Sequence, residues 1–114
     1  MDATQMILLY DYYGELLTKR QRECFELRYH QDLSLAEIGE ELGISRQGVH
    51  DNLSRTEAQL QRMEEKTGCV RRDMQCRLAA CEIQKAAEEL SGYEDQTVTA
   101  LAQQILNAVA GLEE

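Results

Sequence analysis

The chain has 114 residues, and its 12 Lys and Arg against 21 Asp and Glu give a formal net charge of −9. This acidity argues against simple, strong binding to nucleic acid, because nucleic-acid-binding domains are usually basic. The length favours one domain, and no apolar run is long enough to cross a membrane. The N-terminus has no signal-peptide pattern, so we expect a cytoplasmic protein.

Hydrophobic residues recur with a helical period along the whole chain, no stretch alternates with period two, and there is no proline. This pattern predicts an all-α helical bundle. A first helix is expected over residues 2–13 and is broken at Gly14. One face of this helix would hold Met6, Leu9, Tyr10 and Tyr13.

A second helix is predicted to begin after Thr18, where Gln21 stands three residues on and completes a capping box. It would run to about Tyr29 and bury Cys24 and Phe25.

The run from residue 34 to 50 predicts two short helices joined by a tight turn, which is a helix-turn-helix. Ser34 and Glu37 form a second capping box, Gly43 supplies a positive φ, and Ser45 caps the following helix. Hydrophobic staples are expected for two pairs of residues: Leu33 with Ile38, and Ile44 with Val49.

The second helix of this motif is predicted to be unusually long and to reach about Lys66, with Gly68 as its C-cap. Its apolar stripe comprises Val49, Leu53, Thr56, Leu60 and Met63. The end of this stripe needs a cover, for which the C-terminal third supplies candidates. Two more helices are expected there, at 70–90 and 95–110. Their stripes comprise Val70, Met74, Leu78, Cys81 and Leu90, then Val98, Leu101, Ala102, Ile105, Val109 and Leu112.

These segments predict a helix-turn-helix domain over residues 1–68 and a helical extension over 69–114, in the same compact unit. The extension would either pack on the long helix or pair with a second copy, so a homodimer is expected.

The four cysteines form no Cys-x-x-Cys pair, and we expect reduced thiols with Cys24 buried as a small hydrophobe. Cys69, Cys76 and Cys81 lack a nearby fourth ligand for zinc. We therefore expect no metal and no cofactor. The sequence also has no nucleophile–base arrangement and no glycine-rich phosphate loop, so it does not indicate an enzyme.

Residues 44–55 resemble the promoter-reading C-terminal domain of sigma factors, which carries no wing, above all at Val49 and Leu53-Ser54-Arg55. A longer resemblance links residues 8–18, 45–53 and 55–58 to the YlxM family of bacterial proteins. The resemblance implies DNA binding. The genes of this family commonly neighbour that of the signal recognition particle GTPase, which implies a regulatory part in its targeting pathway.

Six polar residues are expected on the outer face of the long helix, with chemistry suited to a major groove: Arg46, Gln47, His50, Asp51, Ser54 and Arg55. Arg46 can make a bidentate contact with guanine, Gln47 can do the same with adenine, and Arg55 suits a phosphate. Three cations at the start of the second helix would hold the DNA backbone: Lys19, Arg20 and Arg22. Alternatively, Arg46 pairs with Glu40 or Glu41, Asp51 pairs with Arg55, and this face is simply solvated.

Two functions follow from these expectations. The first is a dimeric, sequence-specific DNA-binding regulator, whose monomer would bind DNA weakly because its recognition face carries little positive charge. The second is an adaptor without DNA binding that contacts the signal recognition particle GTPase or its RNA. The intact capped corner favours the first function, and the low positive charge favours the second.

Overall fold

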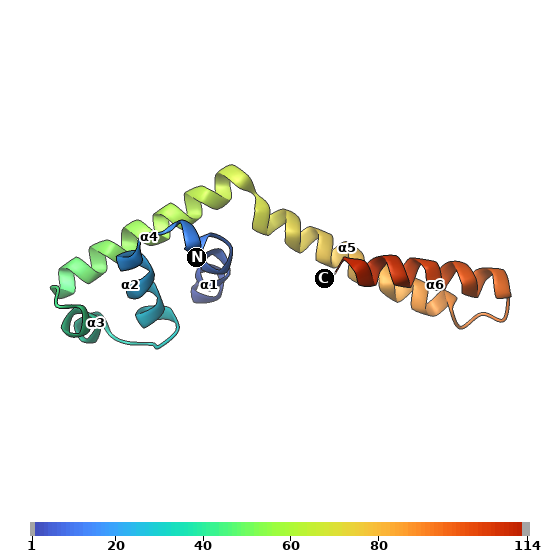
Figure 1. Ribbon diagram of the computed structural model, residues 1–114, viewed down its shortest axis with the longest axis horizontal. Coiled ribbons are helices and arrows are strands. Elements are labelled where there is room, and N and C mark those ends of the chain that lie inside the picture. The colour runs from blue at the N-terminus through green and yellow to red at the C-terminus, as the bar shows by residue number, and fades with distance from the viewer. Residues whose placement is uncertain (1, 113–114) are drawn as a thin grey trace. The chain divides into compact units, whose positions relative to one another are not determined.

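The structure is a computed structural model, and it describes residues 2–112. Six α-helices and one 3₁₀ turn follow one another, and no strand occurs in this part of the chain, so the all-α prediction is confirmed (Figure 1). The elements are α1 (Ala3–Tyr13), η1 (Gly14–Leu16), α2 (Lys19–Tyr29), α3 (Leu35–Leu42), α4 (Arg46–Thr67), α5 (Cys69–Leu90) and α6 (Gln96–Gly111). None of these helices is both long and apolar enough to cross a membrane.

The chain divides into two compact units, Met1–Val70 and Arg71–Glu114. This division lies within two residues of the boundary expected after Gly68, whose φ of 62° ends α4 as predicted. That the two segments fold as one compact unit stays a prediction. Each unit is described separately below.

Side-chain caps define where the helices of the first unit begin. Asp2 with Gln5, Thr18 with Gln21, and Ser34 with Glu37 each form a complete capping box, at the starts of α1, α2 and α3. The two boxes predicted at Thr18 and Ser34 are thus confirmed. The backbone N–H of Ser34 donates to Glu37 Oε1 at 3.1 Å, and this bond lowers the pKa of the Glu37 carboxyl.

One hydrophobic cluster joins α1, α2 and the second half of α4. It contains Met6, Leu9, Tyr13, Leu17, Phe25, Leu60 and Val70, and Tyr10, Tyr29 and Met63 pack against it. The far end of the α4 stripe is therefore covered by α1, for which the C-terminal third had been the expected source. Only Val70, which belongs to the first unit, contributes to that cover from α5.

Aromatic stacking and tyrosine hydrogen bonds connect the helices of this cluster. The ring of Phe25 lies between Tyr10 and Tyr29, with ring centroids 4.3 Å away on each side. The Tyr13 hydroxyl donates to Glu64 Oε1 at 2.6 Å, and the Tyr29 hydroxyl donates to Glu57. Since both glutamates lie on α4, these bonds fasten α1 and α2 to the long helix.

We expect the protein to lose stability in alkali. Burial, reinforced by hydrogen bonds to Glu26 and Glu57, raises the pKa values of Tyr10 and Tyr29 from 10.0 to about 12. Because the folded state favours the neutral phenols, their contribution is intact below pH 10 and disappears as the pH rises through 12. Thermal unfolding followed by circular dichroism should show a melting temperature that falls steadily across this interval.

The variant Tyr29→Phe is the control for this alkaline effect, because it keeps the ring that stacks on Phe25 and has no ionisable hydroxyl. Its melting temperature should depend less on pH in the same interval. An unchanged alkaline slope in Tyr29→Phe would contradict the assignment to this residue.

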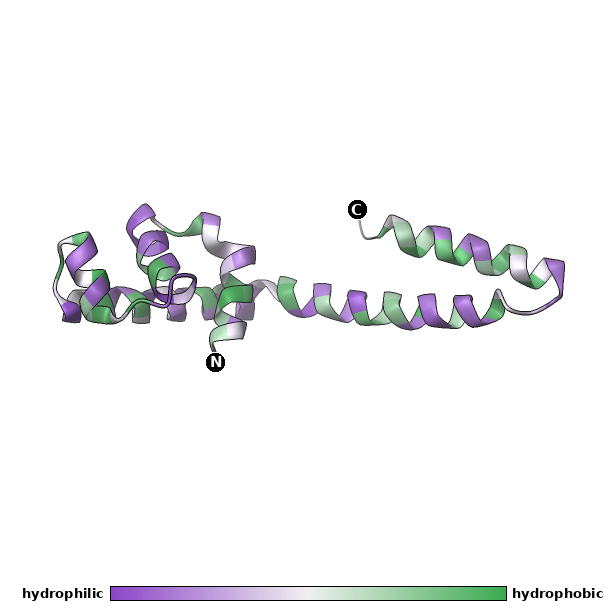
Figure 2. Cartoon of the chain, turned by 90° about the horizontal axis from the view of Figure 1, so that it is seen from below, coloured by the Kyte–Doolittle hydropathy of each residue, from purple (hydrophilic) through white to green (hydrophobic). Residues whose placement is uncertain are grey.

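The second unit is a helical hairpin, in which α6 runs back along α5 after the turn at residues 91–95 (Figure 2). Asp95 caps α6, as its side chain accepts from the N–H groups of Thr97 and Val98. Among the described residues of this unit, the buried side chains are Ala87, Ala102 and Val109. The stripe predicted for α5 is therefore largely exposed: Met74, Leu78, Cys81 and Leu90 face solvent.

Candidate nucleic-acid interface

The corner between α3 and α4 is fixed by backbone geometry. Gly43 ends α3 with a φ of 71°, as predicted, and the N–H of Gly48 donates to Ser45 Oγ at 3.0 Å to begin α4. Gly39 adds a constraint that the sequence pattern did not reveal. A Cβ at this position would lie 2.7 Å from the carbonyl oxygen of Ile44, so glycine permits the close approach of α3 to the turn.

A second hydrophobic cluster supports this corner from below. Cys24, Ile38, Val49 and Leu53 form its buried part, and Leu27, Leu33, Leu35, Leu42 and Ile44 pack against it. All four residues of the two predicted staples belong to this cluster. The predicted burial of Cys24 is also confirmed, and the same burial raises the pKa of its thiol.

The six residues predicted for the recognition face are all exposed, and they lie on the first three turns of α4. Arg46 and Arg55 form no ion pair with any described residue, so neither alternative pairing considered for them occurs. Both guanidinium groups are therefore available to an external partner. The buried stripe of Val49, Leu53 and Thr56 occupies the opposite side of the helix.

Asp51 is the one acidic residue of this face, and it is already occupied. Gln47 Nε2 donates to Asp51 Oδ1 at 3.0 Å, and His50 Nδ1 lies 3.7 Å from the same oxygen. Gln47 must exchange this contact before its amide can pair with adenine. Aspartate can accept a hydrogen bond from the amino group of cytosine, but such a contact of Asp51 would compete with these two neighbours on its own helix.

The three cations predicted at the start of α2 are exposed, but two of them have local contacts. Lys19 and Arg20 each approach Glu23 at 4.0 Å. Arg20 Nη1 also donates to the carbonyl oxygen of Leu42 at 3.3 Å, so it connects α2 to the C-terminal end of α3. Arg20 thus has a structural contact in addition to its predicted place at the DNA backbone.

A groove of about 360 Å³ connects the start of α2 with the recognition face of α4. Its lining comprises Thr18, Gln21, Gly48, Asp51, Asn52 and Arg55. The Oδ1 atom of Asn52 is buried there without a hydrogen-bond partner among the described residues. The groove brings Arg55 and the capped N-terminus of α2 together, a pair of groups suited to a phosphate. The predicted site included Arg55 but missed Thr18, Gln21 and Asn52, since only the fold brings α2 and α4 together.

The exposed side of α3 has the opposite character. Glu37, Glu40 and Glu41 are exposed and, with Leu33, line a shallow depression of about 390 Å³. In helix-turn-helix complexes the first helix of the motif crosses the DNA backbone. Three carboxylates on that helix therefore oppose a close approach of phosphates.

A capped α3, a glycine turn and an α4 whose polar face is exposed define a helix-turn-helix protein. The chain also matches a family model, described as "Putative helix-turn-helix protein, YlxM / p13 like", over residues 1–101. The chain belongs to this family, which confirms the resemblance drawn from residues 8–18, 45–53 and 55–58.

Several curated relatives are named as UPF0122 proteins. One from Thermoanaerobacter sp. (strain X514) is 51% identical over 87 residues, which cover 76% of this chain and 74% of the relative. One from Acetivibrio thermocellus is 55% identical over 78 residues, covering 68% and 67%. A relative from Bacillus cereus (strain AH187) is 53% identical over 64 residues, covering 56% and 58%.

Proposed function

We propose that this protein binds duplex DNA as a homodimer, with the first three turns of α4 in the major groove. The observation that carries the proposal is the pair of exposed arginines, Arg46 and Arg55, on a helix held by a capped corner. In this mode of binding, Arg46 makes a bidentate contact with guanine and Arg55 contacts a phosphate beside the start of α2. Membership of a helix-turn-helix family supports the same conclusion.

The resemblance to the YlxM family extends the proposal to a regulatory role in the signal recognition particle pathway. Binding by one copy would be weak, because two or three phosphate contacts give a salt slope of only about −1.8 to −2.7. Two copies double the number of phosphate contacts and the salt slope, and they match the twofold symmetry of a palindromic site. A dimer is therefore part of the proposed mode of binding.

The acidic side of α3 favours a second candidate, an adaptor that binds a basic surface of a protein. Glu37, Glu40 and Glu41 would attract such a surface and repel a phosphate backbone. From the resemblance to the YlxM family, the GTPase of the signal recognition particle is the candidate partner. An RNA partner would meet the same repulsion as DNA.

Fluorescence anisotropy with the purified chain distinguishes the candidates. The chain is titrated against a labelled pool of random-sequence duplexes and against signal recognition particle RNA, at low and at physiological salt. Duplex binding that persists at physiological salt and can be enriched for a sequence supports the DNA reader. Absence of duplex binding at both salt concentrations contradicts it, and the GTPase is then the next partner to titrate.

A further inference from the structure

The second unit exposes most of the large apolar side chains found on the surface of the described chain. Nine such residues are exposed, and seven of them lie in the hairpin: Met74, Leu78, Ile83, Leu90, Tyr93, Leu101 and Leu112. Scattered exposed apolar residues are normal, but a concentration of them on one element marks an interaction surface.

The spacing of apolar residues places two apolar stripes along one side of the hairpin. The stripe on α5 has heptad spacing and contains Cys76, Ala79, Ile83, Ala86 and Leu90, all exposed. The stripe on α6 contains Leu101, Ile105, Ala108 and Leu112. Buried Ala87 and Ala102 mark the faces that the two helices turn toward each other. For antiparallel right-handed helices with these inner faces, helical geometry places both stripes on the same side.

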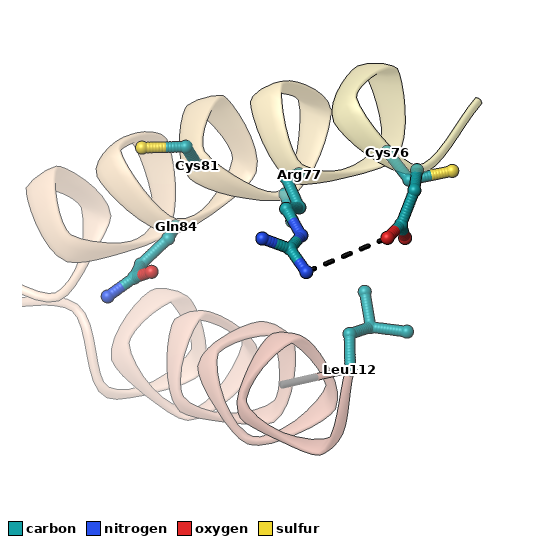
Figure 3. A pocket seen from close by; sticks show the side chains of 7 residues that line it. Cys76, Arg77, Cys81, Gln84 and Leu112 are labelled. Atoms are coloured by element: carbon teal, nitrogen blue, oxygen red, sulfur yellow. Dashed lines mark ion pairs between the residues drawn. The ribbon is translucent and has the colours of Figure 1, made fainter. Parts of the chain in front are cut away.

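The hairpin is also too loosely packed to be a stable domain without a partner. An open cleft of about 820 Å³ remains between α5 and α6, with Cys76, Arg77, Cys81, Gln84 and Leu112 among its lining (Figure 3). Arg77 Nη2 lies 3.6 Å from Asp73 Oδ2 at one side of it. Folded interiors are close-packed, and chains of about 40 residues generally need a metal, a disulfide or a partner chain for stability.

The charges of the hairpin indicate what this partner is. Between residues 96 and 111 α6 has no charged residue. On α5 the arginines lie in the first half, at 71, 72 and 77, and the glutamates in the second half, at 82, 88 and 89. Asp73 and Lys85 are the two exceptions to this division. An antiparallel second copy of α5 therefore brings the arginine-rich first half of one helix opposite the glutamate-rich second half of the other, whereas a parallel copy brings like charges together.

We propose that the apolar side of the hairpin binds the same side of a second copy of this chain, which completes an antiparallel four-helix bundle. The twofold axis passes between residues 79 and 80 of α5, with α5 against α5 and α6 against α6. This inference specifies the interface of the homodimer in the proposed function, and it does not depend on whether the dimer binds DNA.

The oligomeric state tests the interface. Light scattering coupled to size-exclusion chromatography should give twice the chain mass for the wild type and the chain mass for Ile83→Glu. The matched control is Leu16→Glu, which also adds a charge at an exposed apolar residue but lies in the first unit; it should remain dimeric. A monomeric wild type would overturn the proposal, as would a wild-type assembly larger than a dimer or an Ile83→Glu variant that stays dimeric.

Disulfide trapping tests the register without weakening the interface. In a background with all four native cysteines replaced by alanine, Ala79→Cys places two thiols beside the axis, and oxidation should give a covalent dimer. Ala86→Cys lies on the same stripe, but its two copies would be about 20 Å apart along the axis, from 1.5 Å per residue. It should stay uncrosslinked. Equal crosslinking of both variants indicates a parallel pair and overturns the antiparallel arrangement.

The two proposals fail in different ways. A dimer that crosslinks at position 79 but binds no duplex supports the proposed interface and contradicts the proposed DNA binding. A monomer that binds duplex supports the proposed recognition helix and contradicts the proposed interface. Dimer formation should also weaken at high salt, because the complementary charges of α5 are exposed and screened.

Discussion

The double variant Arg46→Ala, Arg55→Ala should bind duplex DNA about 10- to 100-fold more weakly than the wild type. A good bidentate arginine–guanine contact gives about 1–3 kcal/mol of discrimination, and 1.4 kcal/mol corresponds to a factor of ten. Loss of the Arg55 phosphate contact should also reduce the salt slope by about 0.9 per monomer. Anisotropy titrations at several salt concentrations measure both quantities.

A matched control removes two positive charges elsewhere. Arg62→Ala with Lys66→Ala changes the net charge by the same amount, and both residues are exposed and lie outside the recognition face. This control should retain nearly wild-type affinity. If both double variants weaken binding equally, the chain attracts DNA through its overall charge alone, and the site assignment is wrong. Binding of the GTPase should be unaffected by either pair if that partner docks on α3.

Replacing Phe25 by alanine should produce the largest loss of stability in the first unit. Phe25 is fully buried and lies between two tyrosine rings, and phenylalanine-to-alanine changes in cores cost about 3–5 kcal/mol. Small domains have only about 5–15 kcal/mol of stability, so much of it would disappear. The midpoint of urea unfolding, followed by circular dichroism, is the measurement.

Two controls separate this effect from a general sensitivity to mutation. Phe25→Leu keeps most of the volume and loses the stacking, so it should cost clearly less than the alanine variant. Leu78→Ala removes a large apolar side chain that is 70% exposed, and it should leave the midpoint of the first unit unchanged. A similar midpoint for Phe25→Ala and Phe25→Leu would show that the cavity is not the main cost.

The sequence was sufficient to predict the helices, their starts and the helix-turn-helix corner, because these features depend on residues only a few positions apart. The capping boxes at Thr18 and Ser34 each join two residues that are three positions apart. The glycines at 43 and 68 end helices through their own left-handed backbone conformation. Each position carries a residue type that few other local structures require. Local chemistry therefore decided the element boundaries to within one or two residues.

Contacts between distant segments were not predictable in the same way. Apolar stripes show which side of a helix needs a cover, but not which helix provides it. The end of the α4 stripe is covered by α1 through contacts such as that of Tyr13 with Glu64, which are 51 residues apart in the chain. The same limitation explains why the stripe predicted for α5 is exposed after Val70.

The candidate site shows both cases. The exposure of Arg46 and Arg55 follows from the position of the buried stripe on α4, so the helical period was enough to predict it. The bond from Arg20 to Leu42 and the groove beside Asn52 depend on how α2 lies against its neighbours. Only the folded chain reveals them.

The close approach at Gly39 has a consequence for how such a protein diversifies. The angle between α3 and α4 depends on the absence of a side chain at Gly39, and the six outward residues of α4 take no part in setting it. The direction of the helix and the chemistry it displays are therefore encoded by separate positions. Substitutions on the outward face can change what is recognised while the orientation of α4 relative to α3 stays the same, so new specificity arises without a new fold.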